Sequence, residues 1–202
     1  MIGIAIIEDQ AMLRSAIVAL LRLEPDMTVL AELDSGDDAA VETVRRAKPE
    51  VLLLDIEMTG RSGLDVAEHL QREDDPPKII MLTTFKRPGY LRRALEAGAR
   101  AYLTKDAPVS DIAAAIRRVA AGDVLITGEQ VAVAMSSGAN PLTRRERDVL
   151  RASLNCDTIA EVAAQLHLSA STVGNYITEA IAKTKAGNRL QAIRVARENG
   201  WL

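Results

Sequence analysis

Residues 51–55 read VLLLD, four apolar residues that end in a carboxylate. An apolar run of this length without alternation is typical of a parallel strand that helices cover on both faces. Three other apolar runs are each followed by a polar or charged side chain: Ile2–Ile7 by Glu8 and Asp9, Ile79–Leu82 by Thr83, and Ala101–Thr104 by Lys105. The carboxyl ends of parallel strands share one edge of a sheet, and ligands bind there. We therefore expect these side chains to meet in one crevice.

Strand and helix patterns alternate over the first 121 residues. The predicted strands are Ile2–Ile7, Thr28–Leu33, Val51–Leu54, Lys78–Leu82 and Ala101–Thr104. The predicted helices are Ala11–Leu23, Gly36–Ala47, Gly63–Arg72, Pro88–Ala97 and Ser110–Ala121. This alternation predicts a doubly wound α/β domain of flavodoxin-like type, with five parallel strands in the order 2-1-3-4-5.

The pattern changes after Gly122. A short helix is predicted at Gln130–Met135, and SSGANP (residues 136–141) is typical of a linker. Four further helices are predicted at Thr143–Ser153, Thr158–Gln165, Ala170–Lys183 and Leu190–Asn199. Thr143 and Glu146 form a capping-box pattern, and the second and third of these helices form a helix-turn-helix. We expect an α/β domain at 1–121, a linker at 122–141 and a small all-α domain at 142–202.

Composition bounds the class of protein. The net charge of −3 divides unevenly: residues 1–138 carry 16 Lys and Arg against 22 Asp and Glu, and residues 139–202 carry nine against six. A basic C-terminal domain makes nucleic acid a candidate partner. The single cysteine, Cys156, fits a reducing compartment. With no apolar run near ~20 residues and no basic leader, we expect a cytoplasmic protein without membrane insertion.

The side chains at the strand ends suit phosphoryl chemistry. Mg²⁺ prefers oxygen ligands, and Glu8, Asp9 and Asp55 would supply carboxylates to it. Asp55 can act as a nucleophile, because a carboxylate can form an acyl phosphate. Lys105 adds a cation beside the incoming phosphoryl group, and the Thr83 hydroxyl can donate a hydrogen bond to it.

The segments IIEDQ (6–10), LLLDIEMTGRSGLD (52–65), MLTTF (81–85) and AYLTKD (101–106) closely resemble the receiver domain of bacterial two-component response regulators. The resemblance implies that a sensor histidine kinase phosphorylates Asp55, with the backbone carbonyl of Glu57 as a further Mg²⁺ ligand. It also makes Thr83 and Tyr102 a switch pair, in which Tyr102 moves into space that Thr83 vacates. Thr59 departs from the family, which usually has proline there.

The stretch TTFKRPGYLRRALEAGARAYLTKD (83–106) is similar to the regulators of membrane-lipid desaturation within this family. The resemblance implies a phosphorylation-sensitive dimer surface around the predicted helix Pro88–Ala97. A solvated basic face is the alternative. The basic residues concerned are Lys86, Arg87, Arg92 and Arg93.

The segments PLTRRERDVL (141–150), IAEVAAQLHLSASTVGNYI (159–177) and NRLQAIRVARENG (188–200) resemble the output domain of the NarL/FixJ group, which carries a LuxR-type helix-turn-helix. The resemblance implies that the third helix enters the major groove and that the fourth pairs two subunits. The candidate DNA-binding residues are Ser171, Thr172, Asn175, Tyr176, Arg144 and Lys183, and Ile193 and Arg197 are the dimer candidates on the fourth helix. Gly174 and Ala160 stand where the group often has lysine, which removes two phosphate contacts.

These patterns together predict a DNA-binding transcriptional response regulator and not an enzyme. Phosphorylation of Asp55 would promote formation of a homodimer that binds promoter DNA. One alternative is a DNA-binding regulator that works without phosphorylation and has a vestigial receiver. A second is an aspartyl phosphatase of the haloacid-dehalogenase type with Asp55, Glu57 and Thr59 in its motif, although that motif normally opens its domain.

Overall fold

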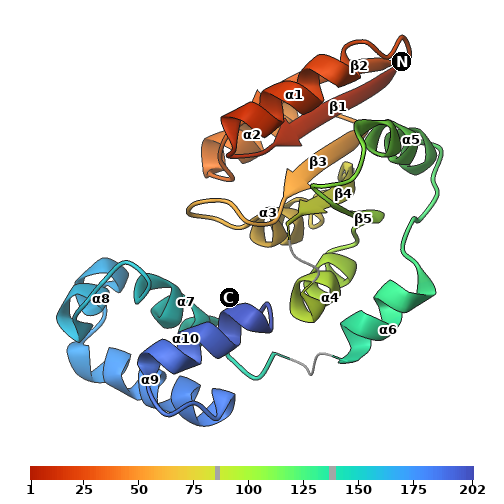
Figure 1. Ribbon diagram of the computed structural model, residues 1–202. Helices are drawn as coiled ribbons and strands as arrows, with labels where there is room; N and C mark the ends of the chain where they lie inside the picture. The colour runs from red at the N-terminus through yellow and green to blue at the C-terminus, as the bar shows by residue number, and fades with distance from the viewer. Residues whose placement is uncertain (85–86, 137–139) are drawn as a thin grey trace. The chain divides into compact units, whose positions relative to one another are not determined.

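The computed structural model describes residues 1–84, 87–136 and 140–202 (Figure 1). The chain forms two compact units, one made largely of residues 1–134 and the other largely of residues 135–202. Within the described ranges, the first holds a sheet and six helices, and the second holds four helices. Among the described residues, no helix is long and apolar enough to cross a membrane.

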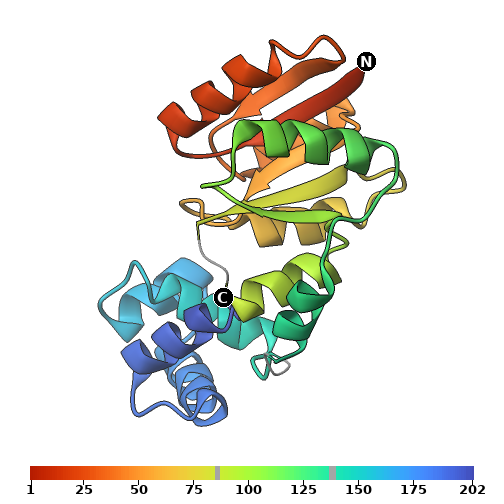
Figure 2. The ribbon, with the colours of Figure 1, turned by 45° about the vertical axis from the view of Figure 1, so that its right-hand side comes forward.

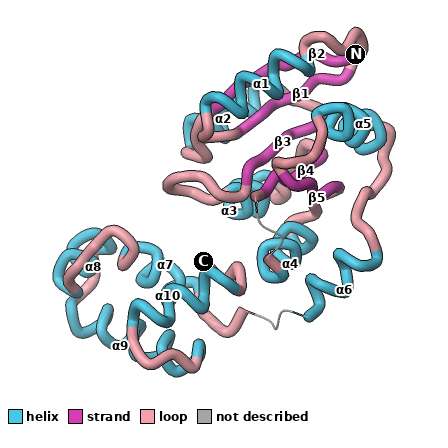
Figure 3. The backbone as a smooth tube through the Cα atoms, viewed as in Figure 1, coloured by secondary structure: helices cyan, strands magenta, loops and turns pink. Residues whose placement is uncertain are grey.

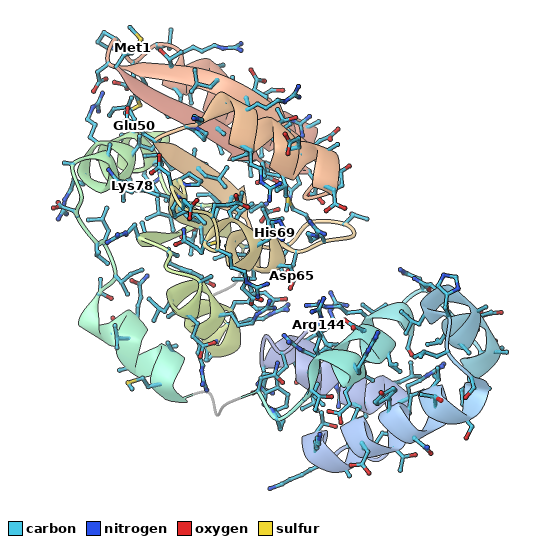
Figure 4. All side chains as sticks on the ribbon, turned by 180° about the vertical axis from the view of Figure 1, so that it is seen from behind. Met1, Glu50, Asp65, His69, Lys78 and Arg144 are labelled. Atoms are coloured by element: carbon cyan, nitrogen blue, oxygen red, sulfur yellow. The ribbon has the colours of Figure 1, made fainter. Side chains whose placement is uncertain are left out.

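The first unit is built on a five-stranded sheet in the order β2-β1-β3-β4-β5, with parallel pairing throughout. The strands are β1 (Ile2–Ile7), β2 (Met27–Leu33), β3 (Val51–Asp55), β4 (Lys78–Thr83) and β5 (Ala101–Thr104). The predicted α/β fold class and strand order are confirmed. Glu50 and Lys78, labelled in Figure 4, mark the amino edge of the sheet, opposite the edge that carries the candidate site.

Helices cover both faces of this sheet, as Figure 3 shows by its colours. They are α1 (Ala11–Leu21), α2 (Asp38–Ala47), α3 (Gly63–Leu70), α4 (Pro88–Glu96) and α5 (Val109–Ala120). Successive residues of β3 alternate between two cores: Leu52 and Leu54 pack with α2, α3 and α4, while Val51 and Leu53 pack with α1 and α5. In Figure 2, α5 is seen against the strands. Burial on both faces explains why these strands are apolar without alternation.

A sixth helix, α6 (Gly128–Ser136), also belongs to the first unit. The segment before it extends the sheet, because Leu125 forms a parallel bridge with Ala101 and its N–H donates to the Arg100 carbonyl at 2.6 Å. Val133 and Ala134 then pack in the core between the sheet and α4. The sequence predicted the helix within a linker, and it did not predict this packing.

The second unit consists of α7 (Arg144–Ala152), α8 (Ile159–Leu166), α9 (Ala170–Thr184) and α10 (Arg189–Glu198). Its helices start where side chains satisfy free backbone N–H groups. The predicted capping box of Thr143 and Glu146 is present, and Thr158 and Glu161 form a second one. His167 ends α8 in the left-handed conformation at φ 53° and turns the chain toward α9. The predicted helix-turn-helix is therefore confirmed.

The two ends of this unit are joined by one side chain. Asn140 donates from its amide to the carbonyl of Trp201 at 3.1 Å, and its Oδ1 accepts the N–H of Leu142 at 2.9 Å. Trp201 packs against the cluster formed by Leu142, Leu150 and other core residues. The residues that enter the unit therefore lie against those that end it.

Candidate functional site

Three carboxylates meet at the carboxyl edge of the sheet. Glu8 and Asp9 follow β1, Asp55 ends β3, and one oxygen from each lies within 4.8 Å of the others. Glu8 and Asp55 are fully buried, while Asp9 is half-buried. The parallel pairing of β1 with β3 brings these ends together, as the sequence suggested.

Lys105 is the cation of this cluster. Its Nζ lies 2.9 Å from Asp55 Oδ2 and 2.9 Å from both Glu8 oxygens. Burial lowers the pKa of Lys105, but the two carboxylates outweigh this effect and hold that pKa above its ordinary value. Burial and the neighbouring Asp55 charge raise the pKa of Glu8 in spite of Lys105. The carboxylates therefore repel one another, and a single ammonium compensates them only in part.

The loop between β3 and α3 turns back over the cluster. The N–H of Glu57 donates to Asp55 Oδ1, and the N–H of Thr59 donates to Asp9 Oδ2, each at 3.1 Å. Gly60 makes the turn at φ 85°, a conformation that glycine adopts without strain. At Gly63 the first turn of α3 approaches so closely that a Cβ would lie 1.9 Å from the Asp55 carbonyl oxygen.

The donor set fits a hard divalent cation. Glu8 Oε2 and Asp55 Oδ2 are buried, and among the described residues the Lys105 ammonium is the group that faces both of them. Three crowded carboxylates with uncompensated charge are the oxygen ligands that Mg²⁺ prefers. An ion there would relieve the repulsion between Glu8 and Asp55.

The two predicted switch residues lie on neighbouring strands. Thr83 ends β4 and is fully buried, and its carbonyl accepts the N–H of Lys105 at 2.8 Å. Tyr102 lies on β5 and is 4% exposed, within the core that contains α4. Gln130 of α6 donates from Nε2 to the Tyr102 carbonyl at 3.2 Å. The strand that carries Tyr102 is thus tied directly to α6.

The candidate DNA-binding residues lie mainly on the first half of α9. Ser171 and Asn175 are exposed, while Thr172 and Tyr176 are half-buried. The N–H of Thr172 donates to the Ser169 hydroxyl at 3.0 Å, which caps the helix. Tyr176 packs against the core of the unit, which leaves Ser171 and Asn175 as the side chains most open to a ligand.

The two basic candidates differ in environment. Arg144, labelled in Figure 4, opens α7 and is exposed. Lys183 forms an ion pair with the buried carboxylate of Glu146 at 2.6 Å. Burial raises the pKa of Glu146, but Lys183 and the capping contacts with Thr143 outweigh it and hold that pKa below its ordinary value. Lys183 thus links α9 to α7.

The candidate dimer residues are placed unevenly. Lys86 lies outside the described residues, and Arg87 directly precedes α4. Arg92 pairs with Glu96 one turn further along the same helix. On α10, Arg197 is exposed, whereas Ile193 is buried with Leu150 and Ala180 inside the second unit.

Arg93 has a role within the first unit that the sequence did not suggest. The residue is 6% exposed, and its guanidinium pairs with Asp65 at 2.8 Å and with Glu68 at 2.6 Å. Both acids lie on α3, where Figure 4 labels Asp65. Burial lowers the pKa of Arg93, but these two carboxylates raise it more. The residue therefore fixes α4 to α3 and does not present a charge to solvent.

Three further residues escaped the sequence reading: Gly63, Gln130 and the backbone N–H of Thr59. Glycine at the start of a helix and glutamine in a short helix carry no chemical signal of their own. The pair Thr127 and Gln130 was readable as a capping box, and the structure contains both of its hydrogen bonds. The contacts with Tyr102 and Asp9 depend on tertiary packing, so spacing alone could not reveal them.

Comparisons with known proteins agree with this geometry. Residues 4–117 match the family described as "Response regulator receiver domain", and residues 140–196 match "Bacterial regulatory proteins, luxR family". The transcriptional regulatory proteins YvfU and DesR of Bacillus subtilis (strain 168) are each 44% identical to the chain; both alignments cover all of it, with 100% of YvfU and 99% of DesR. Among solved structures, the response regulator ChrA of a haem-sensing two-component system shares 27% identity at a TM-score of 0.55, over 100% of this chain and 98% of that one.

Proposed function

Because the chain belongs to the response regulators that carry a LuxR-type DNA-binding domain, we propose that Asp55 is the residue through which it is switched. The protein is a DNA-binding transcriptional regulator of a two-component system and not an enzyme, which removes the phosphatase alternative. The first unit contains its receiver, for which 1–121 stays a prediction, and the second is its output domain.

The observation that carries the proposal is the buried contact between Lys105 Nζ and Asp55 Oδ2 at 2.9 Å. Phosphoryl transfer needs a nucleophile held in line and cations around the transferred group. Here Lys105 holds Asp55 from one side, and the N–H of Glu57 holds its other oxygen. In the reaction, an Asp55 oxygen attacks phosphorus, an acyl phosphate forms, and the bond to the donor nitrogen of a kinase histidine breaks.

Glu8, Asp9, Asp55 and the Glu57 carbonyl would hold Mg²⁺, whose chemistry at this site is to neutralise phosphoryl charge. Lys105 then compensates part of the negative charge that the phosphoryl group adds. The Thr83 hydroxyl can donate a hydrogen bond to a phosphoryl oxygen, and this bond would draw Thr83 toward Asp55. Tyr102 would follow into the vacated space, so that β5 reports the state of Asp55.

Output requires DNA binding by the second domain. We assign base contacts to Ser171 and Asn175, with Thr172 and Tyr176 beside them and Arg144 on the phosphate backbone. Lys183 would have to leave Glu146 to contact DNA, so we assign it a supporting role. We propose that the active form is a homodimer, and Arg197 on α10 is an exposed candidate for its interface. The predicted cytoplasmic location stays a prediction.

The test is covalent labelling by a small acyl phosphate in the presence of Mg²⁺. Intact mass should increase by one phosphoryl group, and the label should map to Asp55. Asp55→Asn should abolish labelling, whereas Asp74→Asn, which removes an exposed carboxylate elsewhere on the same domain, should leave it unchanged. Labelling that persists in Asp55→Asn would reject the assignment, and no labelling of the intact protein would favour the vestigial receiver.

A further inference from the structure

Thr59 makes a contact across the candidate metal site. Its backbone N–H donates to Asp9 Oδ2 at 3.1 Å, and its hydroxyl oxygen lies 3.5 Å from the same atom. Asp9 follows β1, and Thr59 lies in the loop after β3. The loop that carries the Glu57 carbonyl is therefore fastened to one of the three carboxylates of the cluster.

The contact depends on the amino acid that occupies this position. Proline, which is usual here in receiver domains, has no N–H and cannot donate a hydrogen bond. Any other residue keeps the backbone donor. The donor bonds a charged acceptor, and hydrogen bonds of this kind are stronger than neutral ones. The departure at Thr59 therefore replaces the constraint of a ring by a bond to a metal ligand.

We propose that Thr59 is a positioning residue whose N–H holds the Asp9 carboxylate in the metal-free protein and thereby weakens the affinity for Mg²⁺. The inference rests on the proposed metal site. A bound cation withdraws negative charge from Asp9, so the hydrogen bond is stronger in the metal-free protein than in the loaded one. A contact that favours the metal-free state raises the dissociation constant of the metal by linkage.

The same contact orders the loop without a metal. In a receiver with proline, the ring restricts the loop whether or not the site is filled. In this chain the restriction comes from a bond that the ion must weaken. The Thr59 N–H thus holds the loop in the metal-free protein, and this one contact weakens when the site is filled and the Glu57 carbonyl binds the ion.

Two variants separate the N–H from the rest of the residue. Thr59→Pro removes the N–H, whereas Thr59→Ala keeps it and removes the hydroxyl and the γ-methyl group. Titration of the full chain with MgCl₂, followed by backbone amide resonances, measures the dissociation constant of Mg²⁺. We expect it to fall about threefold to tenfold in Thr59→Pro and to stay within about twofold of the parent in Thr59→Ala.

Hydrogen exchange of the Thr59 amide distinguishes loss of this hydrogen bond from the stiffness that a proline ring would add to the loop. In the parent protein, the Thr59 amide should be protected against hydrogen exchange without metal, and its protection should decrease when Mg²⁺ saturates the site. Unchanged binding in Thr59→Pro would overturn the inference. Tighter binding with unchanged protection of the parent amide would also overturn it, because stiffness would then explain the gain.

Failure of the proposed function has a different signature. If the parent protein binds no Mg²⁺ and Asp9→Asn behaves identically, the metal site itself is wrong and the inference falls with it. If the parent binds Mg²⁺ and Asp9→Asn does not, the site stands, and only the behaviour of Thr59→Pro and of the Thr59 amide decides the inference.

Discussion

Gly63 stands where the first turn of α3 crosses the backbone of Asp55. Every other residue adds a Cβ, which would lie 1.9 Å from the Asp55 carbonyl oxygen and 3.1 Å from a Leu54 side-chain atom. The oxygen belongs to the main chain of a buried strand, so it cannot move without moving Asp55, the proposed phosphoacceptor. The position of the Asp55 carboxylate thus depends on the absence of a Cβ atom at Gly63.

Gly63→Ala should lower the free energy of unfolding by about 1–3 kcal/mol, because the backbone must shift to admit the methyl group. Phosphoryl labelling of Asp55 should slow as well. Gly128→Ala is the matched control, since no heavy atom lies within 4 Å of its Cβ position. Urea unfolding followed by circular dichroism measures the difference, and equal stabilities of the two variants would contradict the close approach.

Glu146 makes the stability of the DNA-binding domain dependent on pH. Its pKa is lower in the folded domain than in the unfolded chain, so its ionised form stabilises the fold above the ordinary glutamate value of about 4.3. This stabilisation is lost as the pH falls through the folded-state pKa. Glu146→Gln keeps the capping geometry without the charge and should be about 1–2 kcal/mol less stable at neutral pH.

The difference between Glu146→Gln and the parent should disappear below the folded-state pKa. Hydrogen exchange of the α7 and α9 amides, measured at a series of pH values, resolves this domain from the receiver. A difference that stays constant from neutral to acidic pH would show that the charge of Glu146 does not contribute.

At the level of elements, α6 connects β5, which carries the proposed switch residue Tyr102, to the chain that leads to the DNA-binding domain. The Gln130 side chain both caps the start of α6 and bonds it to β5. Its Oε1 accepts the Thr127 N–H at 2.9 Å, and its Nε2 donates to the Tyr102 carbonyl at 3.2 Å. Gln130 and Tyr102 also line a pocket with Leu91 and Val133. A movement of β5 would therefore displace the start of α6 first.

Gln130→Ala should release α6 without unfolding the receiver. Loss of a cap costs about 0.5–2 kcal/mol, which speeds exchange of the amides of residues 128–136 by roughly twofold to thirtyfold. Val131→Ala changes the neighbouring exposed residue and should have little effect. Exchange of the α1 and β3 amides serves as the internal reference, and faster exchange throughout the receiver would mean that Gln130 supports the whole fold.

Elements were predictable where local chemistry determines them. Strands that are buried on both faces can be recognised as apolar runs. All five strands of the sheet lie within two residues of their predicted bounds. Helix α2 begins later than predicted, at Asp38, because Asp37 caps it by accepting the Ala40 N–H at 2.8 Å. The burial of Arg93 and the docking of α6 depend on partners 25 or more residues away, which no local pattern encodes.

At the level of the whole molecule, we predict that phosphorylation changes how copies of the chain associate. Beryllofluoride with Mg²⁺ mimics a phosphoryl group on Asp55, and we expect it to convert monomer to dimer in the intact protein. The Asp55→Ala variant should keep its mass under the same conditions. Light scattering coupled to chromatography measures both, and a shift in neither protein would separate phosphorylation from assembly.

Measurements of DNA affinity should distinguish residues that contact the phosphate backbone from residues that contact bases. Arg144→Ala should weaken binding to every sequence alike and reduce the slope of log K against log salt by about one. Asn175→Ala should instead reduce discrimination among sequences by about 1–3 kcal/mol with little change in slope. Binding to oligonucleotides recovered by in vitro selection checks both, and a sequence-dependent loss in Arg144→Ala would reverse these roles.

The bond between Asn140 and the Trp201 carbonyl has a practical consequence. Trp201 is the only tryptophan of the chain, and it lies where the linker enters the DNA-binding domain. Ultraviolet excitation at the red edge of tryptophan absorption therefore excites the DNA-binding domain selectively, because the receiver has no tryptophan. The protein therefore carries an intrinsic fluorophore inside the DNA-binding domain, and the colour and lifetime of its emission should report whether the contact between Asn140 and Trp201 is intact.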